Sequence, residues 1–424
     1  MVIAPDQVHT NDDEAMKTIY DRSAIKSSFY PRMGSWKGIT TTLGILDYAD
    51  AAPTRSNLLN CFQNRNLQNL AENISTHVKI FVQILQDKTD REENVNGVLW
   101  YRLLALDIVT DVLWGESSNL LASANDSTNM FLRRFHAFSK YNALRSFIPG
   151  FDFYVRNFGS QKWKSLRADC DDMDVTAREA LERWSSRENK VHDRDVLSML
   201  LGLDPNAKSN LPIDHLPAYL VEMMAAGSST TSHTGAFVAW SLTRHPDIQR
   251  KLRQELFDAY PDPSNIDLKS CQNLPFLDAV IRETMRMYPM IPGPLERHLG
   301  TSITVDGHTI PPGIIASTSA YTQGRLESVY RNASEWNPQR WPKADARMKL
   351  NWIPFGYGSR SCPGANLAVT ELKSMTAAVF RGLKAVPPTD VAFEEKLELA
   401  DVFAAGTKSG VCWLRFESSS DKVW

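Results

Sequence analysis

The chain has 424 residues, of which 43% are hydrophobic and 23% are charged, and its formal net charge is -2. Such a balanced charge supplies no basic field that would attract nucleic acid, so we expect no nucleic-acid partner. The length exceeds that of a usual single core, yet no linker, repeat or low-complexity stretch divides it. We therefore predict a single domain over residues 1–424.

The cysteines and the N-terminus indicate the environment of the chain. Its five cysteines are widely spaced and odd in number, which predicts neither a disulfide framework nor a zinc cluster. The stretch from Met1 to Asp6 has no basic flank followed by an apolar segment, and no run reaches the roughly 18 apolar residues of a membrane span. We expect a cytoplasmic protein whose chain contains no membrane span.

Most apolar residues recur at helical spacing. This spacing predicts a first helix within residues 96 to 124 that ends near Gly115, and a second from near Asp214 to beyond Trp240. His245–Asp247 interrupts the second helix, and a further helix follows to about Tyr260. The last of these helices covers Leu274 to Met287.

The centre of the helix that begins near Asp214 has an unusual composition. Residues Ala226 to Thr231 place one glycine and four hydroxyl side chains among good helix formers. Serine and threonine can bond back to the carbonyl one turn earlier, which leaves room for water or a diatomic ligand. A polar kink packed against its neighbours explains the same composition, so both interpretations stay open at this point.

Glu283 and Arg286 lie three residues apart on the helix that ends at Met287, so they share one face and can form an ion pair. Taken alone, this spacing is more typical of a surface ion pair, which contributes under about 1 kcal/mol.

The carboxyl part of the chain also contains strand signals. Ile303–Val305 and Ile314–Ala316 flank turn residues, and Val411–Phe416 is a further predicted strand. The predicted fold class is therefore mainly α with a small antiparallel β-sheet.

The most informative segment runs from Phe355 to Gly364 and contains a single cysteine, Cys362, directly before a predicted helix over Ala365–Ala378. Backbone N–H groups and a helix N-terminus favour ionisation of a thiol, so we interpret Cys362 as a thiolate that can bind a metal. Arg360 adds a permanent cation. An ordinary glycine turn that leads into a helix with a core cysteine is the alternative.

Six positions of this segment resemble the cysteine-ligand loop of the cytochrome P450 haem-thiolate monooxygenases, Phe-Gly-x-Gly-x-Arg-x-Cys-x-Gly. The resemblance implies the cytochrome P450 fold and a haem b cofactor (iron protoporphyrin IX) with a cysteine thiolate as axial ligand. It implies that Cys362 binds the iron and that the surrounding loop contacts the cofactor through Phe355, Gly358, Arg360 and Gly364.

Two further segments resemble the same family. Glu283 and Arg286 match its Glu-x-x-Arg helix, and Arg340 matches the later arginine, so the resemblance implies a structural triad that fixes the loop behind the thiolate. The segment from Ala226 resembles the oxygen-binding helix of the family, which implies that Thr230 assists oxygen activation. Ser229 stands where the family has an acid, so it and Thr230 are the candidates for proton delivery.

Basic residues are the candidates for contacts to the haem propionates. Arg297 follows the Glu-x-x-Arg helix at the place where the family has such an arginine, and His298 is the alternative. Ala52–Leu59 occupies the place of a family helix that directs a histidine or tryptophan and an arginine at the haem. Here the histidine is absent and Arg55 is out of register, so the assignment of Arg55 is weak.

The resemblance implies a monooxygenase that activates O2 to oxidise a small, apolar organic substrate, with electrons from NADPH-cytochrome P450 reductase. The amino-acid sequence is most similar to fungal microsomal-type members of secondary metabolism. We also expect the protein to be a monomer. Those relatives are anchored to the cytosolic face of the endoplasmic reticulum by an N-terminal helix, and this chain begins beyond it. The alternatives are oxidative coupling or rearrangement on the same haem fold, and a catalytically impaired haem-binding protein.

Overall fold

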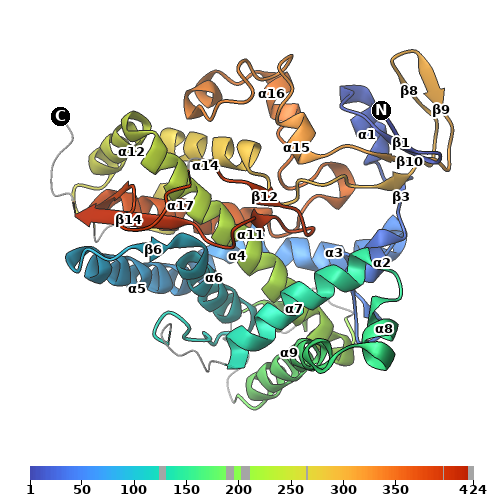
Figure 1. Ribbon diagram of the computed structural model, residues 1–424, viewed down its shortest axis with the longest axis horizontal. Helices are drawn as coiled ribbons and strands as arrows, with labels where there is room; N and C mark the ends of the chain where they lie inside the picture. Colours follow the sequence, from blue (N-terminus) through green and yellow to red (C-terminus); the bar gives the residue numbers. More distant parts are fainter. Residues whose placement is uncertain (124–129, 188–194, 202–210, 264–265, 395, 419–424) are drawn as a thin grey trace.

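The computed structural model describes residues 1–123, 130–187, 195–201, 211–263, 266–394 and 396–418. Helix α11 (Leu216–Arg244) runs through the centre of the molecule (Figure 1) and packs along α6 (Gly97–Trp114). Helix α6 is apolar on nearly its whole circumference, as expected for a helix enclosed on all sides. It ends at Gly115, whose φ of 70° is left-handed. The predicted end near Gly115 is confirmed, and residue 124 lies outside the described residues.

Other helices surround this central pair. The longer ones are α3 (Tyr48–Cys61), α5 (Ala71–Asp90), α7 (Met130–Phe147), α9 (Gln161–Ser185), α12 (Pro246–Ala259), α14 (Pro275–Met287) and α17 (Ala365–Gly382). The shorter ones are α1 (Asp13–Ile19), α2 (Phe29–Met33), α4 (Asn64–Leu67), α8 (Phe151–Phe158), α10 (Val196–Leu200), α13 (Leu268–Cys271), α15 (Ala320–Gln323) and α16 (Ala346–Leu350). Helices α12 and α14 both begin at a proline, which has no N–H to leave unsatisfied in a first turn.

The strands form several small sheets rather than one. The largest has the order β1-β2-β10-β7-β3 and includes a parallel pair, β10 with β2. Its strands are β1 (Val2–Ala4), β2 (Gln7–His9), β3 (Ile25–Lys26), β7 (Arg297–His298) and β10 (Ile315–Ser317). A second sheet contains β11 (Leu383–Val386), β14 (Trp413–Ser418) and β6 (Val95–Asn96). The hairpins are β4 (Ser35–Trp36) with β5 (Ile39–Thr40), β8 (Ile303–Val305) with β9 (His308–Ile310), and β12 (Leu399–Ala400) with β13 (Gly406–Thr407).

These sheets depart from the sequence prediction in one respect. The predicted strands near residues 303 and 315 belong to different sheets, because β8 closes a local hairpin while β10 pairs with β7 and with β2 near the N-terminus. Strand β2 lies about three hundred residues before β10, so no local pattern could have indicated the parallel pair.

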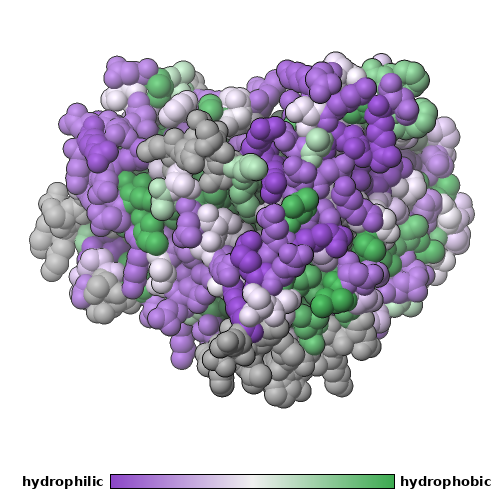
Figure 2. Space-filling view, turned by 90° about the horizontal axis from the view of Figure 1, so that it is seen from below, coloured by the Kyte–Doolittle hydropathy of each residue, from purple (hydrophilic) through white to green (hydrophobic). Residues whose placement is uncertain are grey.

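The surface and the lengths of the helices bear on the expectation that the chain contains no membrane span. The face in Figure 2 is mostly hydrophilic, with separate hydrophobic patches. Among the residues that the structure describes, no helix is both long and apolar enough to cross a membrane.

Candidate functional site

A cavity of about 680 Å³ lies beside α11 and is lined mainly by apolar side chains. Its walls come from segments between Lys26 and Gly410, including α3, α6, α7, α11, α17 and the β12–β13 hairpin. Such a volume and lining are typical of a site for a cofactor and a small organic ligand.

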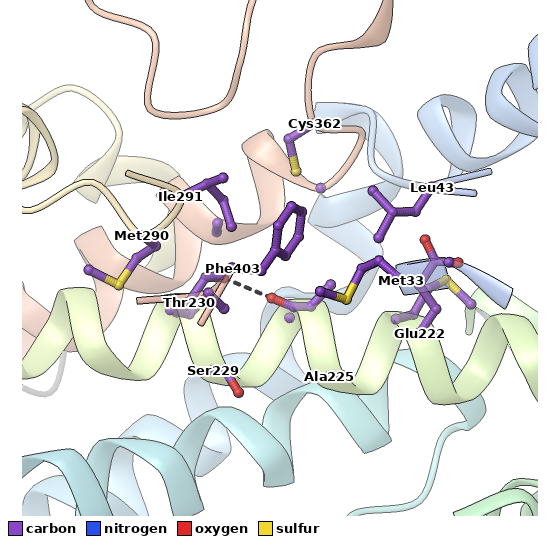
Figure 3. Close-up of a pocket in the computed structure, with 18 of the residues that line it drawn as sticks. Met33, Leu43, Glu222, Ala225, Ser229, Thr230, Met290, Ile291, Cys362 and Phe403 are labelled. Carbon is purple, nitrogen blue, oxygen red and sulfur yellow. Dashed lines mark hydrogen bonds between the residues drawn. The ribbon is translucent and has the colours of Figure 1, made fainter. Parts of the chain in front are cut away.

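Cys362 faces this cavity from the segment before α17. Figure 3 shows its sulfur pointing toward α11. The side chain is exposed to the cavity, but the protein that surrounds the cavity shields the thiol from bulk solvent. The backbone N–H of Cys362 donates to the Phe355 carbonyl at 2.8 Å, which closes the loop. Burial raises the pKa of the Cys362 thiol, whereas the Gly364 N–H and the Arg55 guanidinium lower it. Coordination to a metal cation would reverse the effect of burial, because a bound metal stabilises the thiolate.

Two glycines give the loop its shape. Gly356 and Gly358 have φ values of 74° and 70°, which are left-handed and unfavourable for other residues. A Cβ on Gly358 would also overlap the Tyr20 carbonyl oxygen, while one on Gly356 would meet nothing closer than 3.7 Å. Gly358 therefore allows the loop to approach the segment that follows α1.

The cationic side chains that line the same cavity include Lys26, Arg55, Arg297 and Arg360. In the described part of the chain, none of them has a carboxylate within ion-pair distance. Burial, followed by the repulsion of neighbouring cations, lowers the pKa of Lys26 to about 7 and that of Arg360 to about 10. This uncompensated positive charge suits an anionic ligand.

The hydrogen bonds of these cations fix their positions. Arg360 donates to the carbonyls of Ile45 and Leu46 at 3.2 and 2.6 Å, and its buried Nε has no hydrogen-bond partner. Arg297 donates to the Tyr30 hydroxyl at 2.9 Å and lies over the Tyr30 ring. His298 does not line the cavity and pairs instead with the Gly313 carbonyl. The geometry therefore favours Arg297 over His298.

The structure brings the predicted triad together in the core. Arg286 makes two hydrogen bonds to Glu283, at 2.9 and 2.8 Å, and Arg340 makes a third at 3.1 Å. Asn337 N–H and Trp341 Nε1 also donate to Glu283, at 2.7 and 3.0 Å, so its carboxylate is fully satisfied. A buried charge is tolerated only with such complete pairing. This cluster of hydrogen-bonded side chains connects α14 to residues 324–341. These residues precede the segment from Phe355 to Gly364, which we call the cysteine loop.

Hydroxyl side chains follow one another along the centre of α11. Thr230 Oγ1 donates to the Ala226 carbonyl at 2.7 Å, and the helix continues through this region. Thr230 and Ser229 both line the cavity. Figure 3 shows Thr230 on the side of α11 that faces Cys362, whereas the Ser229 hydroxyl points away from it. The two candidates for proton delivery therefore lie on different sides of the helix.

Comparison with known proteins identifies the family. The family model for cytochrome P450 matches residues 6–411. The chain belongs to the cytochrome P450 family. Members of this family bind haem through a cysteine thiolate and use O2 and a redox partner. This fits the presence of a cysteine at the cavity.

The relatives of this cytochrome P450 include fungal monooxygenases. It is 29% identical over 404 residues to cytochrome P450 monooxygenase BOA3 of Botryotinia fuckeliana, covering 89% of this chain and 76% of that protein. It is 26% identical over 420 residues to benzoate 4-monooxygenase bphA of Aspergillus niger, covering 89% and 79%. It is 25% identical over 396 residues to cytochrome P450 monooxygenase penB of Penicillium thymicola, covering 89% and 87%. The chain is accordingly an oxidoreductase of the monooxygenase type.

The residues of this cytochrome P450 fit a haem. The thiol of Cys362 supplies the ligand type, and the nearby cations include one guanidinium nitrogen, Arg360 Nε, that is buried without a partner. Arg55, which the sequence pattern assigned weakly, lines the cavity and donates to the Ser361 carbonyl beside the cysteine.

Sequence reasoning missed two acidic residues of the cavity, Glu222 on α11 and Glu371 on α17. Figure 3 shows the Glu222 carboxylate beside Met33 and Leu43, on the cavity side of α11. Burial raises its pKa to about 7, against the opposing effects of the Thr41 hydroxyl and Lys26. Its Oε2 has no hydrogen-bond partner. The only signal in the sequence was its position eight residues before Thr230, close to two helical turns.

Proposed function

We propose that this cytochrome P450 is a haem-thiolate monooxygenase that oxidises a small, largely apolar organic substrate in secondary-metabolite biosynthesis. The observation that supports the proposal most directly is the Cys362 thiol, which faces an apolar cavity whose lining includes unpaired cations. The fungal monooxygenases among the relatives support the metabolic context.

In this proposal each residue around Cys362 has a defined role. Cys362 would bind the haem iron, and the Gly364 N–H would stabilise the negative charge of its thiolate. Phe355 would cover the sulfur side of the loop. Arg297 and Arg360 would bind the two haem carboxylates, with Arg55 as a further cation near the cysteine. The bound haem would supply the activation of O2, which no amino-acid side chain can perform.

The residues of α11 supply hydrogen bonds at the reacting end of the cavity. Thr230 can release its hydrogen bond to Ala226 and donate to a ligand or water in the cavity. Ser229 connects this position to the opposite side of the helix, so protons would travel through hydroxyl groups and water rather than through a carboxylate. The triad of Glu283, Arg286 and Arg340 holds the loop and takes no part in the reaction.

The partners follow from what the family requires. We propose NADPH-cytochrome P450 reductase as the electron donor, and a monomeric enzyme that acts as one domain. Lining residues from Lys26 to Gly410 support the single domain, because one cavity uses nearly the whole chain. The name of the Aspergillus relative makes an aromatic acid of benzoate type one candidate for the organic substrate.

A carbon monoxide difference spectrum of the reduced, haem-loaded protein tests the thiolate. The wild type should give a thiolate-type Soret band, and Cys362→Ala should lose it. Cys271→Ala is the matched control, because Cys271 is buried outside the cavity, and it should keep the band. An imidazole-type band, or a thiolate band that survives in Cys362→Ala, would contradict the proposal.

Oxidative coupling or rearrangement on the same haem fold is the second candidate, favoured by Ser229 at the position of the acid. Mass spectrometry of products from a host that contains the reductase separates the two. A product that gains one oxygen atom supports monooxygenation, and an isomerised or dehydrogenated product supports the second candidate.

A further inference from the structure

The cavity has a polar end that the proposed haem contacts do not use. Three side chains from different elements line the cavity there: Arg102 on α6, His233 on α11 and Thr407 on β13. Gly406 allows the hairpin to approach, because a Cβ at that position would come within 2.9 Å of His233 Nε2. An otherwise apolar cavity with a few convergent polar groups is typical of a site that orients a substrate.

Two histidines hold the guanidinium of Arg102. Its Nη1 lies 3.3 Å from His136 Nε2, and its Nη2 lies 3.5 Å from His233 Nε2. His233 Nδ1 lies 2.7 Å from the Ser229 carbonyl, which can only accept, so the proton is on Nδ1 and Nε2 is an acceptor. Burial, with a further contribution from Arg102, lowers the pKa of His233 to about 4, so this imidazole is neutral at physiological pH. The histidines therefore orient the cation without neutralising it.

Arg102 has no acidic partner in the described residues. No carboxylate lies within ion-pair distance of it, and its Nε is buried without a hydrogen-bond partner. Thr407 Oγ1, also buried, lacks a partner as well. A half-buried cation without a counterion is less well solvated than a surface cation, and an anion that enters the cavity would compensate its charge.

We propose that Arg102 binds a carboxylate of the substrate, with the Thr407 hydroxyl as a second donor. The substrate class is accordingly a monocarboxylic acid with an apolar body. This proposal rests on the proposed function, because it names the substrate of the same cavity. His233 follows Thr230 by three residues, so the two are neighbours on the helix surface. Arg102 and Thr230 line the same cavity, so an acid that is bound at Arg102 can extend along the cavity toward Thr230.

A matched pair of ligands tests the proposal directly. The probes are 4-phenylbutanoate and its neutral amide, 4-phenylbutanamide, titrated by calorimetry into the haem-loaded protein. We expect the wild type to bind the acid at least about tenfold more tightly than the amide, the range for a hydrogen bond to a charged group. Arg102→Leu should lose at least about tenfold in affinity for the acid and under about threefold for the amide. Arg102→Lys should retain part of the preference.

Arg91→Leu is the control, because this arginine is 72% exposed and lies outside the cavity, and it should change neither affinity. Thr407→Val should weaken the binding of the acid more than the binding of the amide. The proposal is overturned if the wild type does not prefer the acid, if it binds neither probe, or if Arg102→Leu weakens both equally. Such a failure would leave the carbon monoxide spectrum intact. A missing thiolate band with preserved acid binding would overturn the proposed function alone.

Discussion

Arg286 makes two parallel hydrogen bonds to Glu283, at 2.9 and 2.8 Å, and both side chains are excluded from solvent. Arg286 also donates to the carbonyls of Ala333 and Glu335, at 2.7 and 2.8 Å. One buried guanidinium therefore holds α14 against the segment that leads to the cysteine loop. We propose that this arrangement positions the cysteine loop, since neither Arg286 nor Glu283 lines the cavity.

Glu283→Gln should be strongly destabilising, because it leaves Arg286 as an uncompensated buried charge. We expect a loss of about 3–5 kcal/mol in the free energy of unfolding, measured with denaturant, and a lower haem content. The control is Glu14→Gln, which breaks a surface pair with Lys17 whose glutamate is 80% exposed, and which should cost under about 1 kcal/mol. Equal effects of the two substitutions would contradict the structural role of the triad.

The two loop glycines offer a matched pair of substitutions. Gly356→Ala should cost about 1–2 kcal/mol, since alanine is strained at positive φ but the space around it is free. Gly358→Ala should cost more, because the new Cβ also overlaps the Tyr20 carbonyl. Haem retention during thermal unfolding measures the effect of both substitutions. If Gly356→Ala were the more damaging of the two, the contact between the loop and Tyr20 would not be what shapes the site.

The sequence was sufficient where local patterns decide structure. The helix end at Gly115, the proline starts of α12 and α14, and the segment from Phe355 to Gly364 are each encoded within a few residues. The triad could be predicted because its spacing belongs to a family pattern. The parallel pairing of β10 with β2 could not, since its partner is remote in sequence.

Burial was the other property that the sequence could not supply. Glu222 and Arg102 carry no motif, and only the cavity around them makes their unpartnered polar atoms visible. Burial also outweighs the helix N-terminus at Cys362, which changes the expected ionisation of the free thiol. Long-range packing sets these effects, whereas residue type and spacing do not.

Thr230→Ala should reduce the coupling of NADPH consumption to product severalfold while leaving haem content unchanged, because it removes a cavity hydroxyl on the side of α11 that faces Cys362. Ser228→Ala is the matched control. Ser228 makes the same type of hydrogen bond, to the Met224 carbonyl at 2.7 Å, but does not line the cavity. If Ser228→Ala reduced coupling as much, helix stability rather than the cavity hydroxyl would be responsible.

Ser229→Asp should also change coupling, since it introduces a titratable acid at the position from which protons would enter. The ratio of product to NADPH consumed measures the effect, and haem content serves as the check on folding. Unchanged coupling would remove Ser229 from the proton route.

Glu222→Gln should alter the pH dependence of stability. Burial raises the pKa of Glu222 from its ordinary value of 4.5 to about 7, so the folded state holds this proton more tightly than the unfolded state does. The folded wild type therefore loses stability as pH rises from about 4.5 to about 7, and no further above that range. Glutamine does not titrate, so the advantage of Glu222→Gln over the wild type should grow by roughly 1–3 kcal/mol between about pH 5 and about pH 8.

Denaturant unfolding of both proteins at the two pH values measures this difference, and Lys26 is unchanged in both. Glu14→Gln provides the baseline, because its exposed side chain should give the same difference from the wild type at either pH. A constant difference for Glu222→Gln would mean that this carboxylate is as well solvated in the folded protein as in the unfolded chain. It would then be fully ionised at neutral pH and not a partly protonated acid of the cavity wall.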